Sequence, residues 1–130
     1  MDIGKEFTTD TSKEEAGVAV ELGDATLIIA RSGTKAYNKM VDSLFKKNKK
    51  ALDLKNDAAQ TLSDNLMAEV VGTTLLRGWE GVEEDGKPLP FSKENAIRLC
   101  RIKDFRAFVM EKASDMTLYK AAVEEEIAGN

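Results

Sequence analysis

The residues of this chain best suited to metal chemistry are the carboxylates of the short segment EGVEEDG, residues 80–86. An EF-hand calcium loop needs oxygen ligands at its first, third and fifth positions, a glycine at the sixth and a glutamate at the twelfth. With Gly86 at the sixth position, Glu83 and Asp85 fill the third and fifth, but Gly81 stands at the first and Ser92 at the twelfth. Because the first and last ligands are missing, we predict a solvated turn with Asp85 and Gly86 at its tip and no bound metal.

The same acidic run could supply paired carboxylates for acid–base catalysis. One of Glu83, Glu84 and Asp85 would then have to be desolvated, so that its pKa rises toward neutrality. A run of three acids beside a glycine turn is usually exposed to water, so none of the three is expected to be desolvated. We therefore expect no catalytic role for these side chains.

The remaining groups that could do chemistry lack the partners they would need. The chain contains no histidine, so the commonest general base and the commonest transition-metal ligand are both missing. Cys100, the single cysteine, is expected to be a buried structural thiol on a helix, since a nucleophilic thiol needs an adjacent base. No Gly-Lys-Ser/Thr sequence completes a phosphate-binding loop among Gly72, Gly78, Gly81 and Gly86. We predict no cofactor and no enzymatic activity.

Composition limits the class of protein further. A chain of 130 residues with a formal net charge of −4 suits one domain with a heavily charged surface. No apolar run approaches the roughly 20 residues that span a bilayer, and the N-terminus lacks the basic-then-apolar order of a signal peptide. The acidic balance argues against binding to nucleic acid, and the basic segment Lys46–Lys50 is interpreted as the solvated C-terminal end of a helix. One cysteine excludes an internal disulfide and indicates a reducing compartment.

The N-terminal part of the chain predicts an arm followed by a β-hairpin. Residues 1–16 mix charges, threonine and glycine without periodicity, so we expect a mobile or loosely docked arm. Val18, Val20 and Leu22 then alternate with Ala19 and Glu21, as in a strand with one buried face. The pair Gly-Asp that follows suits a type II′ turn, and the segment ATLIIAR returns as the second strand. A lone hairpin is marginal in water, so it must lie on the helices or pair with another chain.

Hydrophobic periodicity predicts two long helices in the middle of the chain. Thr34 offers an N-cap, and residues 35–50 carry an apolar stripe on one face. The longest helix is predicted to run from about Asp57 through Trp79. Gly72 lies inside it, which makes a close approach of another backbone possible there.

Two shorter helices are predicted after a connecting segment. Ser92 caps the first, and Asp104 caps the second, whose stripe of apolar residues can continue to Val123. Residues 17–130 are expected to form a single domain. The predicted fold class is α+β: a mostly α-helical single domain with a small N-terminal β-hairpin.

The connecting segment, residues 79–96, is stiffened by both prolines of the chain and holds its only tryptophan. Trp79 has two interpretations: an anchor that packs into the core, which we favour, or an exposed aromatic ring that captures a partner. The prolines keep the chain extended and cannot donate backbone hydrogen bonds. We predict a rigid structural connector between two helices, with its shape set by Trp79, Gly81, Gly86, Pro88, Pro90 and Phe91.

The segment GWEGVEEDGKPLPFSKENAIRLC, followed by DFRAFVMEKASD, resembles the tail assembly chaperones of long-tailed, non-contractile bacteriophages. Members of that family typically have an N-terminal strand pair, a helix, a connector marked by Trp, Gly and Pro residues, and an aromatic- and acid-marked terminal helix. The resemblance covers most of the chain from about Gly17. The matching positions are Trp79, Gly81, Val82, Gly86, Pro88, Pro90, Phe91 and Ser92, and then Asp104, Phe105, Val109, Ala113 and Ser114.

The resemblance implies a role without catalysis. Such chaperones bind the tape measure protein, keep that long helical chain soluble while the tail tube polymerises around it, and are absent from the finished virion. The family commonly makes a longer form by translational frameshifting, whose added domain recruits the tail tube protein. The implied location is the cytoplasm of the infected bacterial host.

Two surfaces are expected to serve this role. An apolar helical face suits a long amphipathic helix as partner, and many copies along one chain gain avidity from self-association. We place tape measure binding on Leu62, Leu66, Val70 or Trp79. We place self-association into a homo-oligomer on the hairpin edge or on Phe105, Phe108, Val109 and Met116.

The alternative function is a small phage-encoded regulatory or interaction module that acts on a host protein. A module of this kind that acts on nucleic acid is disfavoured by the acidic balance and by the lack of a basic stripe. The position of the gene, beside a tail tube gene and a very long coiled-coil gene, would favour the chaperone over this alternative.

Overall fold

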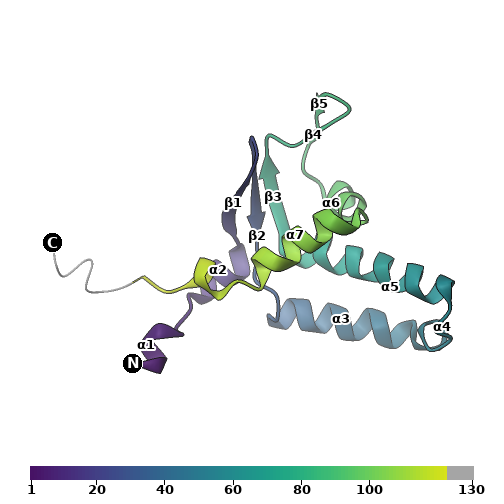
Figure 1. Cartoon of the computed structure of the whole chain (residues 1–130), viewed down its shortest axis with the longest axis horizontal. Coiled ribbons are helices and arrows are strands. Elements are labelled where there is room, and N and C mark those ends of the chain that lie inside the picture. The colour runs from purple at the N-terminus through teal and green to yellow at the C-terminus, as the bar shows by residue number, and fades with distance from the viewer. Residues whose placement is uncertain (123–130) are drawn as a thin grey trace.

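The computed structural model describes residues 1–122 and consists of helices arranged around a small antiparallel sheet (Figure 1). The predicted α+β class is confirmed: the chain is 57% helical, with three antiparallel strands in the sheet. In chain order the elements are α1 (Ile3–Glu6), α2 (Thr11–Ala16), β1 (Val18–Leu22), β2 (Ala25–Ile29), α3 (Lys35–Lys47), α4 (Lys49–Leu52), α5 (Asp57–Val70), a π-helical turn η1 (Val71–Leu75), β3 (Leu76–Glu80), β4 (Glu83–Glu84), β5 (Lys87–Pro88), α6 (Lys93–Cys100), α7 (Lys103–Ala113) and a 3₁₀ turn η2 (Met116–Tyr119).

The predicted hairpin forms with the predicted two-residue turn. Leu22 pairs with Ala25 across Gly23 and Asp24, and Gly23 has φ +59° while Asp24 keeps a negative φ, as a type II′ turn requires. The third strand, β3, pairs antiparallel with β2, so the strand order is β1-β2-β3. The hairpin therefore lies on the rest of the molecule both through its inner face and through β3.

The prediction of one helix from Asp57 through Trp79 is wrong after Val70. The chain passes through η1 and continues as β3, in which Leu76 and Trp79 are buried. The ladder between β2 and β3 shifts at this point, since Ile28 pairs with Gly78 while Ile29 pairs with Leu76. This β-bulge inserts one extra residue and brings two side chains three positions apart onto the same face, a spacing that imitates a helix.

Gly72 makes the close backbone approach that its place in the sequence predicted. A Cβ atom on Gly72 would lie 2.7 Å from both the Cα and the backbone N of Ile97. η1 and α6 can therefore pack with their backbones in contact only because this position carries no side chain. The π-helical turn packs against α6, and α7 and the sheet pack against the π-helical turn.

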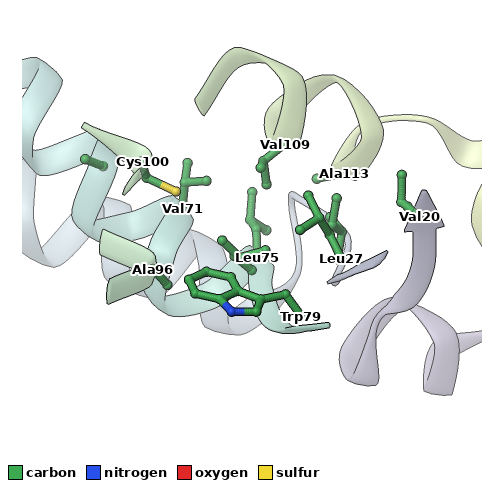
Figure 2. Close-up of a cluster of buried hydrophobic side chains, with 12 residues drawn as sticks. Val20, Leu27, Val71, Leu75, Trp79, Ala96, Cys100, Val109 and Ala113 are labelled. Carbon is green, nitrogen blue, oxygen red and sulfur yellow. The ribbon is translucent and has the colours of Figure 1, made fainter. Parts of the chain in front are cut away.

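The core lies where the sheet, η1, α6 and α7 meet (Figure 2). Val71 and Leu75 of η1 occupy its middle, with Cys100 and Ala96 of α6 on one side and Leu27 of β2 on the other. The fully buried side chains of Val109 and Ala113 cover it from α7. α3, capped by Thr34 as predicted, runs beside α5 and contributes an apolar stripe that is only half-buried.

The last helix ends earlier than its periodicity predicted. α7 stops at Ala113, because the Asp115 carboxylate accepts hydrogen bonds from the backbone N–H and the hydroxyl of Thr117 (3.0 and 2.6 Å) and starts the separate turn η2. That turn directs Tyr119 into the interior, where its hydroxyl donates to the Ile29 carbonyl at 2.9 Å. The predicted continuation to Val123 lies outside the described residues.

The N-terminal segment contains two short helices that contact the end of the described chain. Asp10 caps α2, and its backbone N–H donates to the Tyr119 carbonyl at 2.8 Å. Thr9 forms an isolated antiparallel bridge with Lys120, and Glu14 pairs with Arg31 at 2.8 Å. These contacts give the segment defined docking points, and the mobility expected for residues 1–16 stays a prediction.

Candidate partner-binding surfaces

The connector is a small hairpin with the predicted turn at its tip. Strands β4 and β5 pair so that Glu83 faces Pro88, and both Asp85 (φ +52°) and Gly86 (φ +76°) adopt the left-handed conformation between them. The Leu89 N–H donates to the Val82 carbonyl at 2.9 Å and closes the base of the hairpin. The segment is thus held by its own backbone pairing as well as by its prolines.

Trp79 fixes the connector to the core. Its side chain is 9% exposed, its indole Nε1–H donates to the Leu89 carbonyl at 2.7 Å, and its ring meets that of Phe91 edge-on at 4.9 Å. Gly81 has φ +77°, and a Cβ there would lie 2.8 Å from the carbonyl oxygen of Asp24 in the hairpin turn. Of the two interpretations of Trp79, the structure supports the core anchor.

One residue of the acidic run in the connector, Glu84, forms an ion pair with Arg98 of α6. Both carboxylate oxygens of Glu84 accept hydrogen bonds from the Arg98 guanidinium, at 2.5 and 2.9 Å. This bidentate contact lowers the pKa of Glu84, which is the opposite of what a general acid needs. Within residues 1–122, no three His, Cys, Asp or Glu side chains gather closely enough to hold a metal ion.

Cys100 is buried, as predicted, and the burial disfavours the thiolate form of its side chain. Desolvation raises the pKa of Cys100 from its ordinary value of 9.0 to about 12, although the nearby Arg106 acts in the other direction. Since the thiolate is the reactive species, folding should protect this group from alkylation.

We expect iodoacetamide at pH 8 to label Cys100 roughly a thousandfold more slowly in the folded protein than in urea, from the difference in thiolate fraction. Mass spectrometry of the labelled chain over time measures both rates. Because the pKa of Cys100 is raised from 9.0 to about 12, the thiol contributes stability to the folded state below about pH 9, and this contribution is lost as the pH rises toward 12. Equal labelling rates with and without urea would show that Cys100 is not in the core.

An open groove of about 580 Å³ lies between α5 and α6. Each helix contributes one face to it, through residues spaced by three or four positions. Leu62, Leu66 and Ile97 are its apolar side chains, and charged groups of both signs surround them. The charged and polar lining consists of Asn65 and Glu69 on α5, of Glu94, Asn95 and Arg98 on α6, and of Arg101, which directly follows α6.

The four residues predicted to bind a partner have different environments. Val70 is fully buried, and Leu66 and Trp79 are 6% and 9% exposed, so all three pack the core. Leu62 is half-buried and faces the groove between α5 and α6, with Leu66 beneath it. Leu62 is thus the member of the set that a partner can reach directly, and the binding role stays a prediction for all four.

A second groove, of about 400 Å³, lies between the tip of the β1–β2 hairpin and the start of α7. Phe105 lines it, together with Leu99, Val82 and two strongly exposed apolar residues, Leu22 (40%) and Ile102 (58%). The alternation predicted for residues 18–22 placed Leu22 on the buried face of its strand, and the exposure of Ile102 was not predicted. The available signal was that Ile102 stands between two charged residues at a helix junction.

The residues predicted for self-association do not share one surface. Phe105 lines the second groove, whereas Val109 is fully buried in the core. Phe108 and Met116 are half-buried, and the Phe108 ring lies 5.5 Å from the Lys112 ammonium. Their role in self-association stays a prediction.

These features define a small α+β protein with two open grooves on its surface, each lined by apolar and charged side chains. The family model of the YdaY prophage protein matches residues 32–130, most of the chain, so the chain belongs to the YdaY prophage protein family. It is therefore a phage-derived protein, which confirms the phage origin implied by the resemblance. A search of curated proteins and a search of solved structures returned no match. None of the helices within residues 1–122 combines the length and apolarity needed to cross a bilayer.

Proposed function

We propose that this prophage protein is a tail assembly chaperone, which binds the tape measure protein without catalysis and keeps it soluble during tail tube polymerisation in the host cytoplasm. The phage family and the resemblance of the connector and terminal helix support the proposal. On this view the chain leaves the tail before the virion is complete. A longer frameshifted form would contact the tail tube protein.

The observation that carries the proposal is the groove between α5 and α6. The facing sides of α5 and α6, with the apolar side chains of Leu62, Leu66 and Ile97 between them, offer a binding surface for a third, amphipathic helix. A tape measure chain consists of long helices of this kind. Leu62 and Ile97 are half-buried rather than exposed. The groove can therefore bind such a helix weakly without a large exposed hydrophobic patch.

The charges around the groove favour a partner that carries both signs. Arg101 is exposed and forms no ion pair with any residue from 1 to 122, while Glu69 and Glu94 stand on the two sides of the groove. Charges at the rim of an interface select register and speed association more than they raise affinity. A partner helix with acidic residues near Arg101 and basic residues near Glu69 fits this arrangement.

We expect Leu62→Gln to reduce co-purification of the tape measure protein by about tenfold, because it removes one apolar contact worth roughly 1–2 kcal/mol. The measurement is the amount of tape measure protein retained by the affinity-tagged chain after co-expression. Leu54→Gln is the matched control, since Leu54 is 69% exposed and lies outside the groove. The Leu54 variant should retain its partner.

Equal retention by the Leu62 and Leu54 variants, with both folded by circular dichroism, would remove the groove from the proposal. Retention of a host protein in place of the tape measure protein would favour the alternative, a regulatory module that acts on the host.

A further inference from the structure

The outer strand of the sheet, β1, presents an unpaired edge. Within residues 1–122 it pairs only with β2, and Figure 1 shows it at the outer side of the sheet. Ala19 and Glu21 are exposed, and Leu22 is 40% exposed. Natural proteins usually cover or block such an edge, because it is a template for a further strand.

The hairpin register determines which backbone groups of β1 are free. The two-residue turn makes Leu22 and Ala25 a hydrogen-bonded pair, so the alternating pattern also bonds Val20 to Leu27. The N–H and C=O groups of Ala19 and Glu21 therefore point away from β2. These are the groups that a new strand would bond.

We propose that β1 is a homodimer interface, in which β1 of a second copy adds antiparallel to it and the two sheets become one six-stranded sheet. β1 has five residues with Val20 at their centre, so full overlap of two copies places Val20 opposite Val20. In that register Ala19 lies opposite Glu21 of the second copy, and all the outward N–H and C=O groups of these two residues are satisfied on both chains.

The other registers in which β1 could pair with β1 of a second copy are less favourable, one because of its charges and the other because of its backbone conformation. A shift toward the hairpin tip places Glu21 opposite Glu21, two like charges in direct apposition. A shift the other way places Glu21 opposite Gly17, which lies before the start of β1 and has φ +97°. Full overlap instead sets each glutamate beside an alanine and leaves no like-charge pair.

The side-chain pattern also fits a second copy. Val18 and Val20 share the inner face of the sheet with Leu22, so full overlap brings Val18 of the second copy beside the exposed Leu22. That contact extends the apolar groove already lined by Leu22. The opposite edge, β3, is less suited to the same pairing because its register with β2 is broken by the bulge.

Sedimentation velocity of the purified chain over a wide range of concentration tests the dimer. We expect the natural sequence to dimerise and Ala19→Pro to raise the dissociation constant at least about tenfold, since proline removes an outward N–H and its bonds in both copies. The N–H of Ala19 faces solvent in the monomer, so the fold should tolerate proline there. Ala19→Thr keeps the N–H and should dimerise normally. A strictly monomeric natural sequence, or an Ala19→Pro variant that dimerises as well, would overturn the proposal.

Thiol cross-linking tests the register without relying on the proline variant. Opposed residues in a hydrogen-bonded pair have Cα atoms about 5.5 Å apart, within the range of a disulfide. Mixing Ala19→Cys chains with Glu21→Cys chains under oxidising conditions should give covalent dimers, whereas each variant alone should give few. No cross-link in the mixture, or equal cross-linking of each variant alone, would refute the register. Both tests use the chain by itself, so their outcome is separate from that of tape measure binding.

Discussion

Replacing Gly72 by alanine is expected to destabilise the protein by about 1–3 kcal/mol, the usual cost of overpacking a tight core. The added Cβ would lie 2.7 Å from two backbone atoms of Ile97, and a backbone cannot move aside as a flexible side chain can. α6 would have to shift away from η1, and the contacts of Ala96 and Cys100 would loosen with it. Urea denaturation followed by circular dichroism measures the loss in free energy of unfolding.

Gly78→Ala is the matched control for this prediction. A Cβ at Gly78 would come no closer than 3.7 Å to any neighbour, the Cγ1 atom of Ile28, and the position needs no positive φ. Alanine also costs less conformational entropy than glycine in a strand, so this variant should be as stable as the natural protein or slightly more stable. A Gly72→Ala protein as stable as the Gly78→Ala protein would mean that η1 and α6 are not in backbone contact.

Trp79→Ala is expected to have the largest effect of any single substitution here, about 3–5 kcal/mol. The substitution opens a cavity in the core, leaves the Leu89 carbonyl without its indole donor, and removes the edge contact with Phe91. Because these contacts hold the connector to the sheet, the β4–β5 hairpin should also become more accessible to proteases. Urea denaturation and limited proteolysis of the same samples measure the two effects.

Phe7→Ala provides the comparison for the loss of an aromatic side chain. Phe7 is 56% exposed, so its removal should change the free energy of unfolding by less than about 0.5 kcal/mol. If Trp79→Ala behaved like Phe7→Ala, the tryptophan would have to be a surface residue, and the exposed-aromatic interpretation would return.

The features predicted well from the sequence are those set by neighbouring residues. The turn at Gly23, the cap at Thr34 and the turn at Asp85–Gly86 each depend on the φ angle or the side-chain oxygen of one or two residues. The close approach at Gly72 was also detectable, because a glycine inside an apolar helical pattern needs a reason. Local chemistry of this kind does not depend on what is far away in the chain.

The features that were missed depend on tertiary pairing. β3 forms because β2 offers an edge with which it can pair. The bulge in β3 gives its buried side chains a helix-like spacing, so the sequence pattern predicted a continuing helix. The burial of Val70 and the exposure of Ile102 likewise depend on how α6 and α7 pack against η1, which no local pattern reveals. The candidate site was therefore found in part: Leu62 was named, while the α6 side of its groove was not.

The proposed function and the proposed dimer support each other through avidity. A long tape measure chain offers many helical segments, and two grooves on one dimer can bind neighbouring segments with an effective concentration well above that in solution. Weak individual grooves are then sufficient, and a weakly bound chaperone is easier to displace as the tail tube advances. The groove and the β1 edge lie on different elements, so each can be altered separately.

The most direct test of the central claim is the solubility of the tape measure protein with and without this chain. The tape measure protein of the same prophage is expressed alone, with the natural chain, and with the Leu62→Gln variant, and its soluble fraction is measured after centrifugation. The account predicts an insoluble protein alone, a soluble one with the natural chain, and an intermediate result with the variant. A tape measure protein whose solubility is the same in all three cultures would contradict the account.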